Sequence, residues 1–166
     1  MRRRRSGYSL FELAVALSLL SILIAVFLDR AAVYQEMAEK AAMEQVALDL
    51  RSSVNLKVAE LVLENRFADL VRLSGQNPMD LLTARPANYL GVLPDAAAPG
   101  SVKGKWYFDK ELKETVYCPD LGRNFNVDSG GARCVAWKIV LVGKGALKSE
   151  TPQWARFELV RPYHWF

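Results

Sequence analysis

A run of apolar residues near the N-terminus constrains this chain more than any other feature. Residues 13–28 are 16 positions without a charge, and only Ser18 and Ser21 among them are polar. Counted from Tyr8, the run reaches 21 residues, close to the roughly 20 that a helix needs to cross a bilayer. Four arginines at positions 2–5 precede it, and such charges hold their side in the cytoplasm. The sequence therefore predicts a single membrane pass with the C-terminal part exported.

The remaining chain has the composition of one compact domain. Its 166 residues are enough for a hydrophobic core. Of the 22 Lys and Arg residues, four belong to the arginine run, which leaves 18 positive against 18 acidic residues from position 6 onward. The bulk charge thus gives no support for a nucleic-acid-binding face, and no nucleic-acid partner is predicted.

One acid, Glu12, lies at the apolar start of this segment. A carboxylate inside an apolar helix is costly and usually has a functional partner. The simpler alternative is that its side chain reaches the headgroup region, because it is near the helix end. A plain signal anchor also stays open. A conventional signal peptide is disfavoured, because the run ends in large and charged residues at 27–30 instead of small ones.

The segment SGYSLFEL at residues 6–13 resembles the processing site of the type IV pilin superfamily, which includes minor pilins and the pseudopilins of type II secretion. In that family a prepilin peptidase cuts after a glycine, the new N-terminus is N-methylated, and a glutamate stands at the fifth position after the cut. The resemblance implies that Gly7 ends the leader, Tyr8 is the methylated N-terminus and Glu12 is that glutamate. The family usually has phenylalanine at the position of Tyr8, and tyrosine keeps the aromatic ring. Glu12 would pair with the amine of a neighbouring subunit and set the axial register.

The resemblance implies a structural subunit and no enzyme. We expect a minor pilin of a type IV pilus-like filament, since the head is modest and its connector irregular. A pseudopilin of a type II secretion system is the alternative within the class, and an uncleaved signal-anchored envelope binding protein is the alternative from another class. The implied partners are prepilin peptidase, other pilin or pseudopilin subunits, an inner-membrane assembly platform and, before assembly, the lipid bilayer. The implied location is the bacterial inner membrane with a periplasmic head, and then a filament in the periplasm or at the cell surface.

The expected fold is α+β, with a long spine helix packed on a C-terminal antiparallel sheet of about four strands. The leader covers residues 1–7, the apolar half of the helix 8–30 and an amphipathic half 31–75, with a bend allowed at 64–66. Apolar residues of that half recur at helical spacing. They are Met43, Ala47, Leu50, Val54, Val58 and Leu61.

The rest of the chain divides into a connector and a sheet region. Residues 76–104 are rich in proline and glycine, which predicts an irregular connector with one short helix after Asn77. Residues 105–166 form the predicted sheet. In its longest strand, at 134–142, the alternating large residues should face the helix. These are Val135, Trp137, Ile139 and Leu141, and the tryptophans in general are expected in the core.

The sheet region holds the two cysteines, Cys118 and Cys134. Since the resemblance places the head in an oxidising compartment, a disulfide between them is expected to close the intervening loop. Two cysteines cannot form a tetrahedral metal site, and the single histidine, His164, is distant in sequence. Asp120 and Asp128 are an alternative calcium site but lack an ordered ligand spacing. No catalytic motif, metal or cofactor is predicted, and His164 is interpreted as a tail residue.

Overall fold

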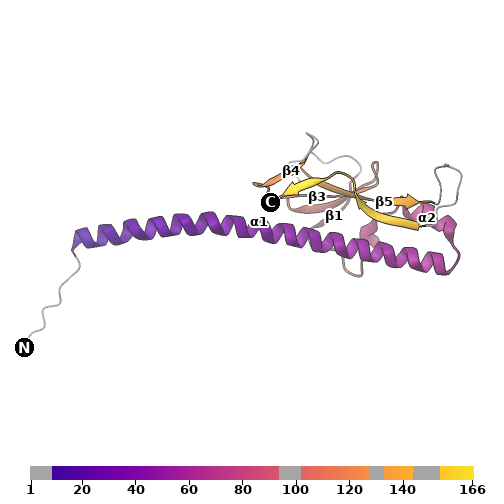
Figure 1. The fold of residues 1–166 in the computed structure, drawn as a ribbon, viewed down its shortest axis with the longest axis horizontal. Coiled ribbons are helices and arrows are strands. Elements are labelled where there is room, and N and C mark those ends of the chain that lie inside the picture. The colour runs from indigo at the N-terminus through magenta and orange to yellow at the C-terminus, as the bar shows by residue number, and fades with distance from the viewer. Residues whose placement is uncertain (1–8, 94–101, 128–132, 144–153) are drawn as a thin grey trace, which may run out of the picture. The chain divides into compact units, whose positions relative to one another are not determined.

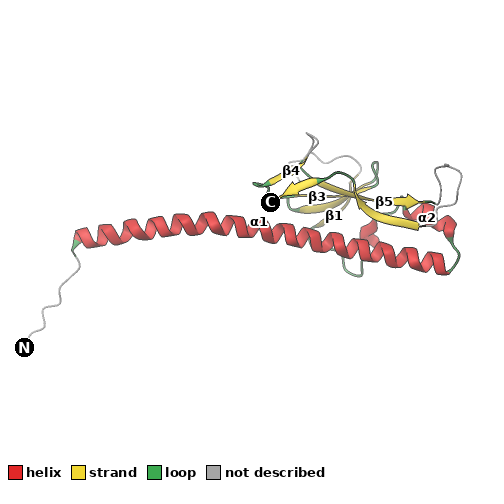
Figure 2. Cartoon of the chain, in the orientation of Figure 1, coloured by secondary structure: helices red, strands yellow, loops and turns green. Residues whose placement is uncertain are grey.

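The computed structural model describes residues 9–93, 102–127, 133–143 and 154–166 (Figure 1). The chain divides into two compact units, Met1–Ala38 and Glu39–Phe166. Helix α1, Leu10–Leu63, contributes to both of them. The second unit, here called the head, combines the C-terminal part of α1 with two sheets, and the fold is therefore α+β, as predicted (Figure 2).

The part of α1 in the first unit is helical without a break, and after Glu12 it carries no charge as far as Leu28. Its most apolar 18-residue window has a mean hydropathy of 2.6, and none of that window is buried within the protein. Length and composition make it the one helix of the described chain able to span a membrane. The hydroxyls of Ser18 and Ser21 donate to the carbonyls of Ala14 and Leu17, each at 2.8 Å. Both polar groups are thus satisfied inside the helix, which suits an apolar surrounding.

The part of α1 in the head buries one stripe against the sheet. Leu50, Val54 and Val58 have no exposed surface, and Met43 and Leu61 are almost as deeply buried. Ala47, the remaining member of the predicted stripe, is partly buried against the same core. The helical periodicity of the sequence thus identified the face of α1 that packs on the sheet.

The helix ends at Leu63, and a turn at 64–66 separates it from α2, Phe67–Leu73. Asn65 has a φ of 57°, a left-handed conformation that asparagine tolerates well. The Arg66 side chain donates to the carboxylates of Glu64 at 2.9 Å and Asp69 at 2.8 Å across this turn. The predicted amphipathic segment is therefore two helices, with the break where the sequence allowed a bend.

The segment expected to be an irregular connector contains more structure than predicted. A short 3-10 helix, η1, covers Pro78–Leu81, and the Asn77 side chain caps it by accepting from the Met79 N–H at 3.1 Å. Strand β1, Tyr89–Leu93, follows and pairs in parallel with β2, Lys105–Asp109. The five residues of β1 lie between prolines and show little strand pattern in the sequence. They form a strand because they pair with β2.

The main sheet has five strands in the order β1-β2-β3-β5-β6. Strands β3, Glu114–Cys118, β5, Val135–Val142, and β6, Trp154–Leu159, complete it, and all pairs except β1–β2 are antiparallel. The prediction of about four antiparallel strands thus omitted the parallel edge strand β1. A second sheet pairs β4, Phe125–Val127, with β7, Tyr163–Trp165.

Aromatic side chains fill the layer between the sheet and α1. Trp106 lies 4.9 Å from Tyr117 and 5.3 Å from Trp137, measured between ring centroids. Trp106, Trp137 and Trp165 are all buried, as expected for core residues, whereas Trp154 on β6 is 38% exposed. Burial of such large side chains provides most of the driving force that holds helix and sheet together.

The two cysteines form a disulfide, with 2.01 Å between the sulfurs of Cys118 and Cys134. The Arg133 guanidinium donates to the carbonyl of Phe125 at 2.8 Å and to that of Gly122. The disulfide and the arginine therefore hold the described parts of the same loop, which carries β4.

Two variants on α1 test the assignment of its buried face. Leu50→Ala should lower the free energy of unfolding by about 2–5 kcal/mol, because it leaves a cavity in the core. Leu56→Ala is the matched control, since Leu56 is 74% exposed, and it should change stability by less than about 0.5 kcal/mol. Urea unfolding of the detergent-solubilised protein, followed by circular dichroism, measures both. Equal effects of the two variants would contradict the packing described here.

Removal of the disulfide tests its contribution to the head. The double variant Cys118→Ser, Cys134→Ser should be about 3 kcal/mol less stable than the oxidised protein, because the bond restricts the unfolded chain. The comparison needs the oxidised protein, the double variant and the wild type under reducing conditions in the same urea titration. The double variant and the reduced wild type should unfold at similar urea concentrations. An unchanged midpoint in both would show that the disulfide does not stabilise the head.

Candidate functional site

The first turn of α1 places Glu12 in a defined position. Helix α1 begins at Leu10, and the Ser9 hydroxyl oxygen accepts from the Glu12 N–H at 3.1 Å. Ser9 and Glu12 thus have the spacing of a capping box, in which the side chain of the residue before the helix satisfies a free N–H. A carboxylate in the first turn also interacts favourably with the positive end of the helix dipole. The Ser-x-x-Glu spacing is the sequence signal for this local role, which the resemblance alone did not indicate.

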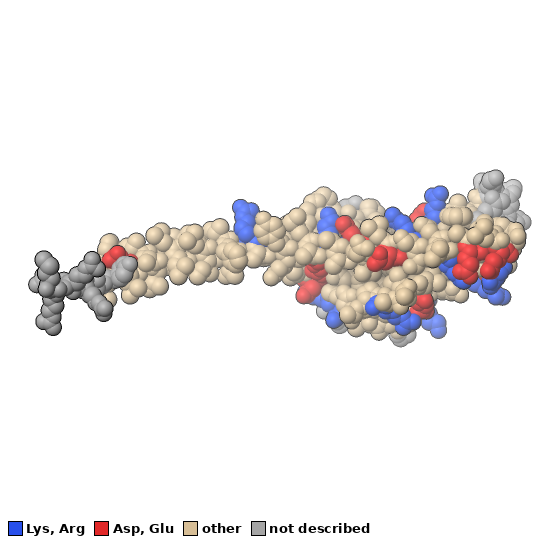
Figure 3. All heavy atoms as spheres, turned by 90° about the horizontal axis from the view of Figure 1, so that it is seen from below, with Lys and Arg blue, Asp and Glu red and all other residues tan. Residues whose placement is uncertain are grey.

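The remaining N-terminal residues of the predicted site, Gly7 and Tyr8, lie outside the described residues. Their relation to Glu12 rests on sequence alone, in which Tyr8 precedes Glu12 by four positions, about one helical turn. After Glu12 the helix carries no charge until Asp29. Figure 3 shows this stretch as a continuous uncharged surface. Glu12 is therefore the single acid of the described apolar stretch at residues 9–28.

In the head, the Glu39 carboxylate of α1 accepts three hydrogen bonds. It accepts from the Tyr117 hydroxyl at 2.8 Å and from the N–H groups of Asp120 and Leu121, both at 2.7 Å. Burial, together with the hydrogen bond to the negative Glu39, raises the pKa of the Tyr117 hydroxyl, which therefore stays protonated as the donor. This contact fastens the start of the disulfide loop to α1.

Lys40, the next residue of α1, holds a different segment, the C-terminal strand β7. The Lys40 ammonium donates to the backbone carbonyl of Trp165 in β7 at 2.7 Å. The Trp165 ring packs edge-on against Phe125 of β4 with 5.1 Å between centroids. His164 lies on the same strand, opposite Asn126, with its side chain exposed. Successive residues of α1 therefore position the loop after β3 and the C-terminal strand.

The alternative calcium site paired Asp120 with Asp128, which lies outside the described residues. Among the residues that the structure describes, no three His, Cys, Asp or Glu side chains gather closely enough to hold a metal ion.

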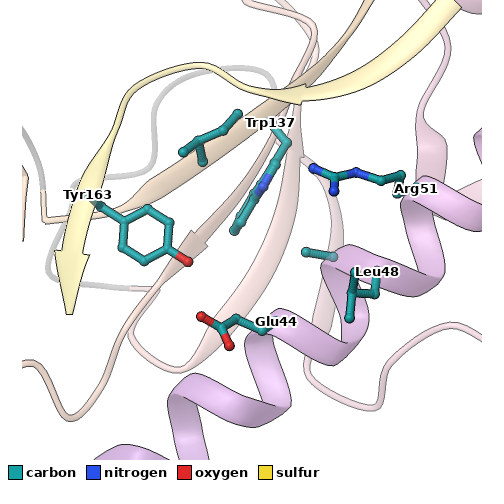
Figure 4. Close-up of a pocket in the computed structure, with 7 residues that line it drawn as sticks. Glu44, Leu48, Arg51, Trp137 and Tyr163 are labelled. Carbon is teal, nitrogen blue, oxygen red and sulfur yellow. The ribbon is translucent and has the colours of Figure 1, made fainter. Parts of the chain in front are cut away.

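Among the residues that the structure describes, two hollows lie between α1 and the side of the sheet at β6. The first, about 290 Å³, contains Glu44 and Arg51 of α1 and Trp137 and Tyr163 of the sheets (Figure 4). Ala47, Leu48 and Leu159 complete its wall. Burial, followed by the nearby Glu44 carboxylate, raises the pKa of Tyr163. Figure 4 shows the Tyr163 hydroxyl and the Glu44 carboxylate turned toward each other, while the Arg51 guanidinium points toward Trp137.

The second hollow, about 510 Å³, shares Arg51 with the first. Its other lining residues are Asn55, Trp154, Arg156, Phe157 and Glu158. Neither hollow was predicted from the sequence, because both arise where an exposed flank of α1 passes the last strand of the sheet.

Comparison with known proteins locates a family signature at the N-terminus. Residues 2–28 match the family described as the prokaryotic N-terminal methylation motif. No curated protein and no solved structure matches the chain. The matched segment includes the arginine run, Gly7, Tyr8, Glu12 and the apolar residues that follow. The chain therefore carries, over residues 2–28, the prepilin-like N-terminal signal that is typical of type IV pilins.

Proposed function

We propose that this chain is a structural subunit, a minor pilin, of a type IV pilus-like filament. The methylation motif at residues 2–28 is the observation that carries this proposal. The exposed apolar helix and the disulfide-bonded head support it, because disulfides form and persist in the oxidising compartments outside the cytoplasm. Pseudopilins of type II secretion share the same signal. The assignment to a type IV pilus-like filament instead of a secretion system is therefore the more specific part of this proposal.

In this proposal the arginines hold the leader in the cytoplasm while the apolar part of α1 crosses the inner membrane. Prepilin peptidase then cuts between Gly7 and Tyr8, and the new amine of Tyr8 is N-methylated. The head folds in the periplasm, where the disulfide forms. An assembly platform subsequently moves the helix from the lipid bilayer into the growing filament.

Glu12 provides the register of assembly. Cleavage creates an ammonium group at Tyr8, and in a stack of parallel helices the ammonium of one subunit meets Glu12 of the next. In a medium of low dielectric constant this attraction is strong and offsets the desolvation of both ions. The charge pair also distinguishes one axial position from all others along otherwise uniform apolar helices. The first-turn position of Glu12 leaves its carboxylate exposed for such a contact.

Replacement of the glycine tests the cleavage step. Gly7→Leu should leave the leader attached, because the side chain obstructs the peptidase at the bond to be cut. Ser6→Ala is the neighbouring control and should be processed normally. Intact-mass spectrometry of the protein from its native membrane should give a methylated chain from Tyr8 for wild type and control. A wild-type chain that starts at Met1 would contradict the proposal and leave a signal anchor.

Replacement of the glutamate separates cleavage from assembly. Glu12→Gln should be cut and methylated, yet its incorporation into filaments should fall by at least about tenfold, because the ammonium of the neighbour loses its partner. Glu60→Gln, which breaks a surface pair with Lys57, is the control on the same helix and should assemble normally. The readout is the amount of protein in sheared filaments relative to membranes. Normal incorporation of Glu12→Gln would refute the register mechanism.

A further inference from the structure

Strand β6 forms one edge of the main sheet. Within the described residues, β6 pairs only with β5, so its other side presents backbone N–H and C=O groups without a strand partner. The larger hollow is lined both by exposed residues of β6, such as Arg156 and Glu158, and by the buried Phe157 between them. Because alternate residues of a strand point to opposite faces, a hollow that touches both sets lies along the strand edge.

This hollow carries an excess of positive charge. Arg51 reaches it from α1 and Arg156 from β6, and within the described part of the chain neither guanidinium forms a hydrogen bond or ion pair. Glu158 is the one acid in the lining, and it lies directly opposite Lys138 on β5. Two arginines without a partner among the described residues, beside a strand edge that no described strand covers, favour a carboxylate ligand, since guanidinium binds carboxylate in a bidentate geometry.

The smaller hollow continues the surface past Arg51. Its wall is mainly apolar, with Leu48, Trp137 and Leu159, while Glu44 and Tyr163 face each other within it (Figure 4). Side chains two positions apart on a strand are separated by about 6.5–7 Å and lie on the same face. A strand laid along β6 can therefore place an acidic side chain near Arg51 and an apolar one in the smaller hollow.

We propose that the head binds an extended acidic segment of another polypeptide, which pairs with β6 as a sixth strand. Its backbone hydrogen bonds to the strand edge, its carboxylate binds between Arg51 and Arg156, and an apolar side chain two positions away enters the smaller hollow. Strand addition of this kind draws affinity from the main chain and specificity from the alternate side chains. The inference goes beyond the proposed filament role and depends on head residues alone.

Nucleic acid is the competing ligand, because arginines beside an exposed tryptophan also suit a single strand. The peptide is favoured for two reasons. The chain has no net charge from residue 6 onward, whereas affinity for a phosphate backbone depends on an excess of positive charge. A free strand edge, in addition, offers hydrogen bonds that match a peptide backbone and have no counterpart in a nucleic acid.

The test uses the full chain in detergent micelles and a set of short fluorescent peptides. The reference peptide has a central aspartate, valine two positions before and after it, and threonine elsewhere. Asparagine and lysine twins replace the aspartate, and two N-methylated forms block alternate sets of backbone N–H groups. Fluorescence anisotropy gives the Kd of each, and a single-stranded oligothymidylate is the nucleic-acid probe.

The aspartate peptide should bind roughly tenfold more tightly than the asparagine twin, with the lysine twin weaker still. One N-methylated form should lose binding and the other keep it, because only alternate N–H groups of the added strand face β6. Arg51→Gln and Arg156→Gln should each weaken binding about five- to tenfold. Arg72→Gln removes a largely exposed charge from α2, outside the lining of either hollow, and should leave the Kd unchanged. Circular dichroism confirms that each variant is folded.

Several results would overturn the inference. Equal binding of the aspartate and lysine peptides would show that the arginines do not select an acid. Equal binding of both N-methylated forms would exclude strand pairing. Absence of peptide binding would mean that the charges of β6 only protect the edge from aggregation. Arginine-dependent binding of the oligothymidylate without peptide binding would assign the site to nucleic acid, and arginine-dependent self-association without peptide binding would assign it to a second copy. None of these results depends on cleavage after Gly7, so the filament proposal stands or fails separately.

Discussion

The burial of one stripe of α1 against the aromatic face of the main sheet is the contact on which the head depends. Leu50, Val54 and Val58 have no exposed surface, and they belong to the same buried cluster as Trp106 and Trp137 of the sheet. Because this contact uses only one face of the helix, the flank that carries Arg51 is left beside β6. The same helix thus provides the core of the head and one wall of both hollows.

Polar contacts from α1 then position the less regular parts of the head. Glu39 holds the chain just after β3, and Lys40 holds the carbonyl of Trp165 in the last strand. The disulfide joins the two ends of the loop that carries β4, and β4 pairs with β7. Segments with few apolar residues are therefore held by hydrogen bonds and one covalent bond, while the strongly apolar strands pack on the core.

The first turn of α1 combines two requirements that act at different stages. The Ser9 hydroxyl oxygen accepts from the Glu12 N–H and so caps the start of the helix. The family signature at residues 2–28, in contrast, concerns processing and the exposed apolar surface. In the proposed filament, the carboxylate that helps to begin the helix would also receive the ammonium of a neighbouring Tyr8. One residue can serve both purposes, because a helix N-terminus and a nearby ammonium favour negative charge alike.

The sequence by itself determined the apolar helix, the amphipathic stripe and the faces of the long strand β5, since hydrophobic periodicity directly reflects which side is buried. It also contained the N-terminal signature, whose residues are contiguous. Only the tertiary structure decided that residues 89–93 form a parallel edge strand and that Glu39 binds the loop after β3. The hollows around Arg51 belong to this second group as well. Each of these features joins residues far apart in the chain, or depends on a neighbour that supplies hydrogen bonds, and no local pattern encodes such a contact.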